Sequence, residues 1–388
     1  MSLPPNSMTS PAWAAVVSMS LGIFAIVGAE FLPASLLTPI ATGLDVSEGQ
    51  AGQMVTITAI VGLPTSLLIS VVSGRIDRRL LLIGLTALMV VSNLLVFIAP
   101  SLLTVLLARA LLGVSLGGFW ALAAATMMRL VPEKDVPRAL SILFFGVSAA
   151  TVFAAPFGSF FGEILGWRAT FLAAACIGAV ALLVQILTLP SMPSVNTARL
   201  STAFAIARRP GVAGGLLAIL FVFSGHFAFF TYMRPFLETV TLVGPTGVTA
   251  ILLLFGIGTF VGNAASSLLI ARSMRATLTV TPLCLSIAAI WLAVAGGTVM
   301  IDAALATLWG ALFGIVPVSW STWLTRIMPD ATESGGGLVI ATTSLAITLG
   351  AAGGGLIFDN FGGRNAMFGA AVLLMFAFVA STRVRRGA

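Results

Sequence analysis

The sequence predicts an all-α integral membrane protein with twelve transmembrane helices in two pseudo-symmetric six-helix bundles. Three observations support this prediction: the composition, a series of apolar runs and an internal repeat. Of the 388 residues, 59% are hydrophobic and 8% are charged, whereas soluble domains carry about 25% charged residues. The net charge of +7 comes from basic residues in short loops without interleaved aromatic residues. We therefore expect a lipid bilayer, and no nucleic acid, as the partner.

The apolar runs are each about 20 residues long, which is the length that a helix needs to cross about 30 Å of hydrocarbon. They are continuously apolar and do not alternate, so they are not strands of a barrel. The predicted spans are 12–36, 50–73, 80–99, 102–128, 138–161, 168–189, 212–233, 246–270, 277–298, 301–324, 335–357 and 365–382.

The loops between these spans carry their positive charge on one side, as the positive-inside rule requires of cytoplasmic loops. The other side holds only Arg168, Arg234 and Arg364, and Arg109 lies within a span. Both termini are therefore expected in the cytoplasm. The residues on the basic side are Arg75, Arg78, Arg79, Arg129, Lys134, Arg138, Arg199, Arg208, Arg209, Arg272, Arg275, Arg326, Arg383, Arg385 and Arg386.

The second half of the chain repeats the first. The stretch MRLVPE at 128–133 returns as TRIMPD at 325–330, which gives an offset of 326 − 129 = 197. Arg168 likewise corresponds to Arg364, at 364 − 168 = 196. The segment 190–211 contains prolines and no apolar run, so it reads as a linker. We expect a bundle over 1–189, a cytoplasmic linker over 190–211 and a second bundle over 212–388, which is the arrangement of a rocking transporter.

Glu30 is the acidic residue that stands out, because it lies inside the first apolar run. An ionised group at bilayer depth costs roughly 2.5–3.5 kcal/mol, so it rarely occurs there without a purpose. Arg109 in the fourth span lies at a similar depth, since both residues are about 10 Å from the outer boundary at ~1.5 Å per residue. Glu30 could exchange protons, with Arg109 stabilising its deprotonated form, or the two could form a permanent ion pair. No phosphate-binding motif for ATP occurs, and one carboxylate does not suit sodium.

Several motifs resemble those of the major facilitator superfamily. SGRIDRRLL at 73–81 resembles its cytoplasmic loop motif, ARALLG at 108–113 its fourth-span motif, and AAPFGSFFG at 154–162 its fifth-span antiporter motif. The resemblance implies roles in the conformational switch for Pro156 and Gly158. Asp77, Arg78 and Arg79, together with a contact between Arg129 and Glu133, are expected to form cytoplasmic charge contacts that break as the halves rock, or simply to anchor the topology.

Four further stretches, GAEFLPASLL, RALLGVSLGGFWALAAATMMRLVP, FAFFTYMRP and VPVSWSTWLTR, resemble the drug:proton antiporter branch and, within it, the bacterial purine ribonucleoside efflux pumps. The resemblance implies proton-coupled efflux of purine ribonucleosides by alternating access across a bacterial inner membrane. A broader multidrug or sugar-like exporter is the alternative. A membrane enzyme or a sensor is disfavoured, because no HExxH motif and no paired catalytic carboxylates occur in the spans.

A purine site should offer aromatic faces and a few polar groups. In the fold that the chain resembles, the fourth, seventh and tenth spans line the central cavity. His226, the only histidine, could accept from a nucleoside hydroxyl, transfer protons, or serve only as an interhelical hydrogen-bonder. The candidate substrate-binding residues are Phe119, Trp120, His226, Phe229, Tyr232, Asn263, Trp320 and Trp323.

The remaining residues indicate no cofactor and no metal site. Cys176 and Cys284 lie apart in apolar runs, without the spacing of a metal motif or a cluster of histidines. The expected partners are a small-molecule substrate, protons and lipid, and the protein is expected to act as a monomer.

Overall fold

The computed structural model describes residues 12–72, 76–193, 212–327 and 332–384. The first half contains α1 (Trp13–Ser35), α2 (Leu37–Leu44), α3 (Glu48–Val72), α4 (Arg78–Ile98), α5 (Leu102–Leu130), the 3₁₀ turn η1 (Glu133–Asp135), α6 (Val136–Leu165) and α7 (Trp167–Thr188). The second half contains α9 (Val212–Phe230), α10 (Met233–Thr239), α11 (Pro245–Ala295), α12 (Val299–Ile327), α13 (Thr332–Phe361) and α14 (Gly363–Thr382).

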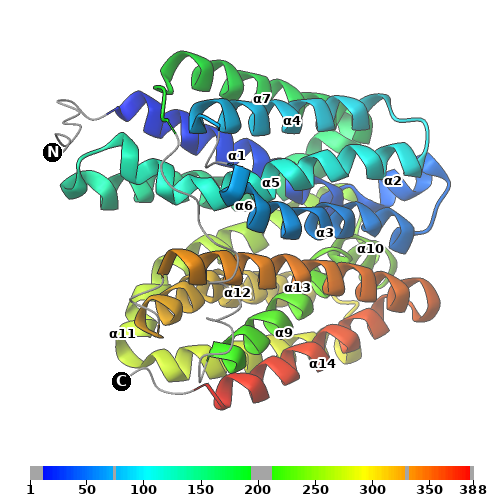
Figure 1. Ribbon diagram of the computed structural model, residues 1–388. Helices are drawn as coiled ribbons and strands as arrows, with labels where there is room; N and C mark the ends of the chain where they lie inside the picture. The colour runs from blue at the N-terminus through cyan, green and yellow to red at the C-terminus, as the bar shows by residue number, and fades with distance from the viewer. Residues whose placement is uncertain (1–11, 73–75, 194–211, 328–331, 385–388) are drawn as a thin grey trace, which may run out of the picture.

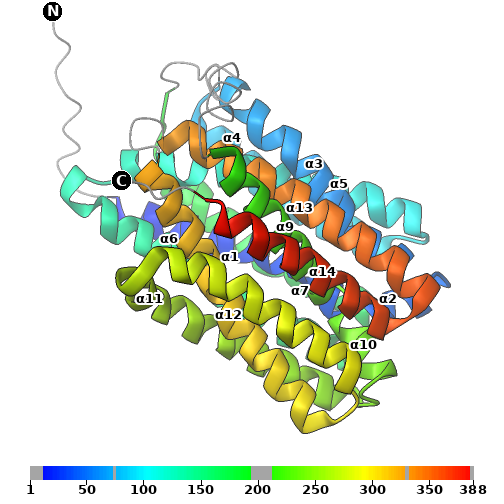
Figure 2. The same cartoon turned by 90° about the horizontal axis from the view of Figure 1, so that it is seen from below.

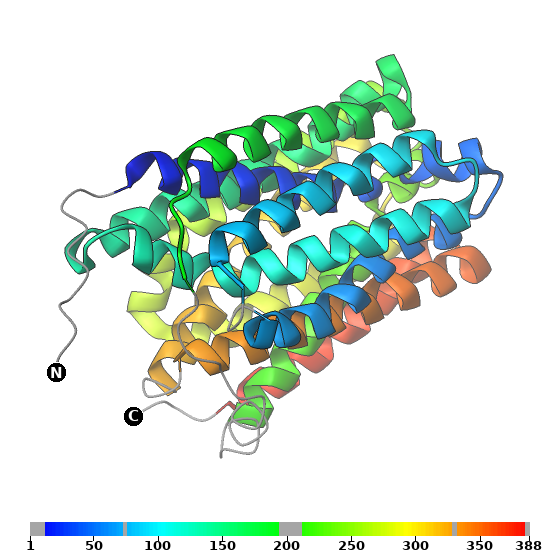
Figure 3. The same cartoon turned by 45° about the horizontal axis from the view of Figure 1, so that its top comes forward.

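These helices form two layers that lie one above the other in Figure 1, with α1–α7 above and α9–α14 below. Figure 2 shows α11, α12 and α14 side by side in the second layer, and Figure 3 shows α1, α4, α5 and α7 in the first. Between the layers, α3 packs along α13 and α6 along α11. The bundle boundaries themselves, with the linker mostly outside the described residues, stay a prediction.

The prediction of twelve spans is confirmed once α11 is divided. Eleven described helices are long and apolar enough to cross a membrane, but the 51 residues of α11 would extend about 77 Å as one helix. That is more than twice the hydrocarbon thickness. Ser273 has φ −165° and ψ 102°, outside the helical region, and breaks α11 into two spans. The break lies between the predicted spans 246–270 and 277–298.

The internal repeat is visible in the packing of the backbone. A Cβ on Gly117 of α5 would meet the carbonyl oxygen of Gly62 in α3, and a Cβ on Gly314 of α12 would meet that of Thr259 in α11. The two pairs are related by the repeat offset, because 314 − 117 = 197 and 259 − 62 = 197. Small residues let membrane helices approach this closely. The two halves therefore repeat the same helix–helix contact.

Two short helices were not predicted. α2 follows α1, and α10 follows α9, and the two pack against each other across the halves. Their starts, Leu37 and Met233, are again 196 residues apart. They lie together at one end of the molecule, on the right in Figure 1; we call it the α2–α10 end. The end at which α4 begins, with Asp77, is called the Asp77 end.

Among the described residues, the buried apolar cluster that contains both halves has its first-half members towards the α2–α10 end. There, first-half residues such as Leu37 and Met54 belong to one buried cluster with Phe229 and Trp309 of the second half. Towards the Asp77 end, the buried residues of the first half, such as Met19 and Met127, form a separate cluster. Burial of apolar surface thus holds the two halves together at one end.

Candidate substrate and proton-coupling site

Pro33 gives α1 an unsatisfied carbonyl close to its carboxyl end. Proline has no backbone N–H, so the carbonyl of Ala29, four residues earlier, loses its helical donor. Arg109 of α5 fills this gap, because its Nη1 donates to the Ala29 oxygen at 2.9 Å and its Nη2 lies 3.5 Å from the Glu30 carbonyl oxygen. The Arg109 side chain is fully buried. Its first observed role is to satisfy the backbone of α1.

Arg109 and Glu30 share a level in the bundle, as the sequence predicted. Within the described chain, however, their side chains form no ion pair within 4.0 Å. The guanidinium lies close enough to the carboxylate for an electrostatic interaction. Arg109 therefore holds the main chain beside Glu30 and leaves the carboxylate available, and the predicted coupling between them stays a prediction.

Aromatic rings surround the position next to Glu30. Phe31 of α1 meets Phe230 of α9 edge to face, with ring centroids 5.4 Å apart. The His226 ring lies between Phe313, at 3.3 Å, and Phe230, at 5.5 Å, and is nearly parallel to both. We call Phe31, His226, Phe230, Phe255 and Phe313 the aromatic cluster. It spans both halves, because Phe31 of α1 contacts Phe230 of α9.

Trp309 fixes the histidine of this cluster. Its Nε1 donates to Nδ1 of His226 at 3.2 Å, and its ring stacks on Phe229 with centroids 3.8 Å apart. Phe229 and Trp309 are both buried. Phe229, a predicted substrate contact, thus supports Trp309 and does not belong to the aromatic cluster.

The structure does not bring the other predicted substrate contacts to this cluster. Tyr232 lies at the α2–α10 end, where its hydroxyl donates to the Ala351 oxygen at 2.8 Å. Phe119 is buried against Gly22 of α1. Trp120 is half-buried, with its ring centroid 6.5 Å from that of Phe144. Asn263 lies 3.4 Å from the Ser148 hydroxyl across the halves.

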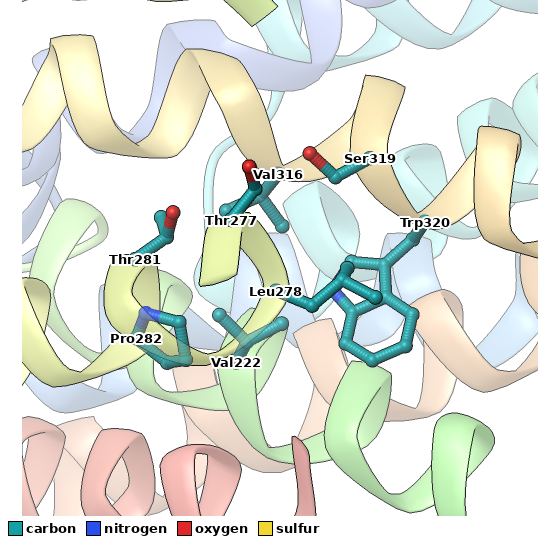
Figure 4. Close-up of a pocket in the computed structure, with 8 residues that line it drawn as sticks. All are labelled: Val222, Thr277, Leu278, Thr281, Pro282, Val316, Ser319 and Trp320. Carbon is teal, nitrogen blue, oxygen red and sulfur yellow. The ribbon is translucent and has the colours of Figure 1, made fainter. Parts of the chain in front are cut away.

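Trp320 and Trp323 lie further along α12, with ring centroids 5.4 Å apart. Trp323 packs against Gly215 of α9. Trp320 lines a small cavity between α9, α11 and α12, together with Val222, Thr277, Leu278, Thr281, Pro282, Val316 and Ser319 (Figure 4). Its free space of about 10 Å³ suits at most one water molecule. A nucleoside does not fit there in this conformation.

The sequence did not single out Phe31, Phe230, Phe255, Phe313 or Trp309. Phenylalanine is common in this chain, with 26 residues, so no single ring stands out. The adjacency of Phe31 to Glu30 was the available signal. The stacking on His226 depends on which helices face each other, and spacing within one helix does not show this.

Asp77 caps the start of α4. It accepts from the Arg79 N–H at 2.7 Å and from the Met192 N–H at 3.0 Å, and it also accepts from the Ser191 hydroxyl. Partial burial opposes its ionisation. The hydrogen bonds from Ser191, Met192 and Arg79 and the charge of Arg129 outweigh that effect, so that the pKa of Asp77 lies below its usual value.

The other predicted switch residues also bind locally. The Arg78 N–H donates to Met192 O, Arg79 Nη2 donates to Ile186 O, and Arg129 Nη2 donates to Pro193 O instead of pairing with Glu133. The Arg78 and Arg129 contacts tie the first half to residues 192–193, and the Arg79 contact ties α4 to the end of α7. Pro156 lies inside α6, and Gly158 packs directly against Ser35 of α1. A switch role for these residues stays a prediction.

Charged residues of the second half hold the α2–α10 end. Arg234 donates to the Ser35 oxygen at 2.6 Å, at the carboxyl end of α1, and to Glu238 at 2.8 Å. Asp359 accepts from the Ser47 hydroxyl at 2.5 Å and the Gly49 N–H at 2.9 Å, at the amino end of α3. A cation thus meets a helix C-terminus and an anion meets a helix N-terminus, which is the favourable pairing with each helix dipole.

Asp302 is a second acidic residue within the predicted spans, since it belongs to the span 301–324. It lies in the first turn of α12 and is 1% exposed. Its Oδ2 accepts from the Thr241 hydroxyl at 2.6 Å and from the Gly297 N–H at 2.9 Å. Asp302 therefore organises the loop between α11 and α12 at the α2–α10 end.

Twelve apolar spans in two repeated halves, with aromatic contacts between the halves, are the architecture of a multi-pass membrane transporter. Residues 19–339 match the model of the Major Facilitator Superfamily. The chain belongs to this superfamily.

Relatives and solved structures agree with this assignment. The chain is 42% identical over 381 residues to the purine ribonucleoside efflux pump NepI of Escherichia coli O6:K15:H31, covering 98% of this chain and 96% of the relative. It is 43% identical, with the same coverage, to NepI of Salmonella paratyphi C. A bacterial homologue of the lysosomal transporter Spinster and a D-xylose-proton symporter each match with a TM-score of 0.77, at 18% and 15% identity, over 96% of this chain and 97% of theirs.

Proposed function

We propose that this protein exports purine ribonucleosides from the cytoplasm in exchange for protons, by alternating access between two six-helix bundles, 1–189 and 212–388. The relatives of 42–43% identity are named as purine ribonucleoside efflux pumps and match almost the full length. The observation that carries the proposal is the position of Glu30. It is an ionisable residue in α1 whose backbone carbonyl oxygen lies beside Arg109, and the next residue, Phe31, meets Phe230 of the other half edge to face.

In this scheme, Glu30 carries the proton. A carboxylate in a poorly solvated interface exchanges a proton more readily when it faces water than when it is enclosed, so that its occupancy follows the side to which the site opens. Arg109 supplies a nearby positive charge that favours the deprotonated form. Substrate in the aromatic cluster and a proton on Glu30 then alternate, which is the requirement for antiport.

The same scheme assigns the conformation. By the positive-inside rule, the α2–α10 end lies on the outer side of a bacterial inner membrane, and both termini lie on its cytoplasmic side. The shared core and the bonds of Arg234 and Asp359 at that end support a state closed to the outside. Opening to the outside requires the helices of the first half to move relative to their neighbours. The residues that act at the contacts which change are Asp77, Arg78, Arg79, Pro156 and Gly158. The protein works as a monomer, because each chain contains both halves of the site.

A proteoliposome assay tests the substrate. We expect an imposed proton gradient to drive inosine and guanosine, and chloramphenicol and lipophilic cations much less. Glu30→Gln should lower gradient-driven transport by about 5- to 150-fold, the usual range of coupling between two sites, and leave nucleoside binding in place. Glu163→Gln, which changes an exposed carboxylate on α6, is the matched control. Preferential transport of the drugs would instead indicate the multidrug alternative. Undiminished gradient-driven transport by Glu30→Gln would show that Glu30 does not couple transport to protons.

A further inference from the structure

The hydrogen bond from Trp309 determines the tautomer of His226. An indole nitrogen is only a donor, so the Nδ1 that faces Trp309 Nε1 must accept. In the neutral imidazole, the hydrogen then sits on Nε2. A proton on Nδ1 would point at the indole N–H, and this contact therefore opposes the cationic ring.

The packing around the ring keeps this arrangement rigid. Phe313 and Phe230 cover its two faces, and Phe227 meets it edge to face at 5.1 Å. None of these neighbours is charged, and the side chain is 2% exposed. A ring stacked between two others cannot rotate freely, so that its two nitrogens keep their directions.

Nε2 is the part of His226 that is left available. It makes no hydrogen bond to any residue in the described ranges, and it is not among the fully enclosed polar atoms. Because the side chain is only 2% exposed, water reaches this donor poorly, and leaving it without a partner is costly. An acceptor on a bound molecule, lying in the plane of the His226 ring, would satisfy the Nε2 donor.

We propose that His226 is a hydrogen-bond donor of fixed tautomer that recognises a ring acceptor of a planar heteroaromatic substrate, and that Trp309 is the residue that positions it. This inference rests on the proposed function, which identifies the substrate ring as a purine. It adds the hydrogen bond by which the protein recognises that ring. His226 then donates to the substrate through Nε2, and it does not carry the transported proton.

The tautomer can be tested without substrate. His226 is the only histidine, so ¹⁵N-histidine labelling of the full chain in lipid gives one pair of ring nitrogen resonances. We expect a protonated Nε2 and an unprotonated Nδ1 throughout the range of about pH 5 to 8 in which a free histidine changes charge. Trp309→Phe should lose this fixed pattern and show both neutral tautomers, because nothing then holds Nδ1 as the acceptor. An Nδ1–H tautomer, or a cationic ring in the wild-type protein within that range, would overturn the proposal.

Acceptor-deleted nucleosides test the recognition. The wild-type protein should bind inosine about tenfold more tightly than at least one of 7-deazainosine, 3-deazainosine and the analogue that lacks the 6-oxygen, as expected for one lost hydrogen bond. His226→Gln, which keeps a donor, should retain this preference, and His226→Phe should lose it. Full preference for inosine in His226→Phe would overturn the contact. If the wild-type protein binds none of these nucleosides, both the proposed function and the contact with the substrate ring are wrong. The ¹⁵N resonances of His226 still determine its tautomer in that case.

Discussion

Glu30 and His226 occupy the same position in the two halves. They are 226 − 30 = 196 residues apart, the offset that also relates Leu36 to Tyr232. The backbone confirms this register, because the Leu36 N–H donates to Pro33 O and the Tyr232 N–H to Phe229 O, each at 3.2 Å. The first half therefore presents an acid beside an arginine, where the second presents an imidazole beside a tryptophan.

The neighbours of these two positions differ consistently. Pro33 has Phe229 as its counterpart, and Arg109 has Ala306, at 306 − 109 = 197. The second half has no proline at this point and so no unsatisfied carbonyl for an arginine to fill. Pro33 thus leaves the Ala29 carbonyl for Arg109 to bind, and this bond also places the Arg109 charge near Glu30. This difference supports a division of labour, with proton exchange in the first half and ring recognition in the second.

The largest expected effect on stability comes from breaking the link between Arg109 and Pro33. Arg109→Gln leaves the Ala29 carbonyl without its donor, at a cost of about 1–3 kcal/mol in the free energy of unfolding. Pro33→Ala restores a backbone N–H to that carbonyl, so that Arg109→Gln should cost less in this background. Thermal unfolding of the four variants in detergent measures the coupling.

Arg168 provides the matched control, because its Nη2 donates at 3.2 Å to Ala99 O, at the end of α4, and not to a carbonyl of α1. Arg168→Gln should cost the same with and without Pro33→Ala. Equal costs of Arg109→Gln in both backgrounds would show that Arg109 does not act through the proline carbonyl.

The glycine contacts test what the halves share. Gly117→Ala and Gly314→Ala each place a methyl group against a backbone carbonyl that cannot move aside, and each should destabilise the protein by about 1–3 kcal/mol. Gly84→Ala, where a Cβ meets nothing within 4 Å, should be neutral or slightly stabilising. A large loss at only one of the two repeat-related positions would contradict the repeated packing.

The smallest expected effect concerns Asp359. Asp359→Asn removes the negative charge at the start of α3 and weakens the bonds to Ser47 and Gly49. Since one such hydrogen bond contributes about 0.5–1.5 kcal/mol, amide exchange in α2 and α10 should quicken by roughly 2- to 10-fold. Asp45→Asn changes an exposed carboxylate at the same end and should leave the exchange unchanged. Unaltered protection in Asp359→Asn would show that this contact does not hold the end closed.

The fold could be predicted from the sequence because the thickness of the bilayer determines how long an apolar span must be. The internal repeat then showed which helices of the two halves correspond. The short helices α2 and α10 were missed because they are too short to span. Within the site, Glu30, Arg109 and His226 were identifiable, since polar groups in apolar runs are rare. The rings that stack on His226 were not, because contacts between helices such as Phe31 with Phe230 depend on how each helix is rotated. Tyr232 and Trp323 contact neighbouring helices in this structure, and their predicted role in substrate binding stays a prediction.

Counting protons during substrate binding tests the central claim most directly. Purified protein in weakly buffered detergent solution, with a pH-sensitive dye, should release protons when inosine is added. Glu30→Gln should bind inosine without this release, and His226→Gln should release protons as the wild-type protein does. Proton release by Glu30→Gln equal to that of the wild-type protein would contradict the assignment of proton exchange to Glu30.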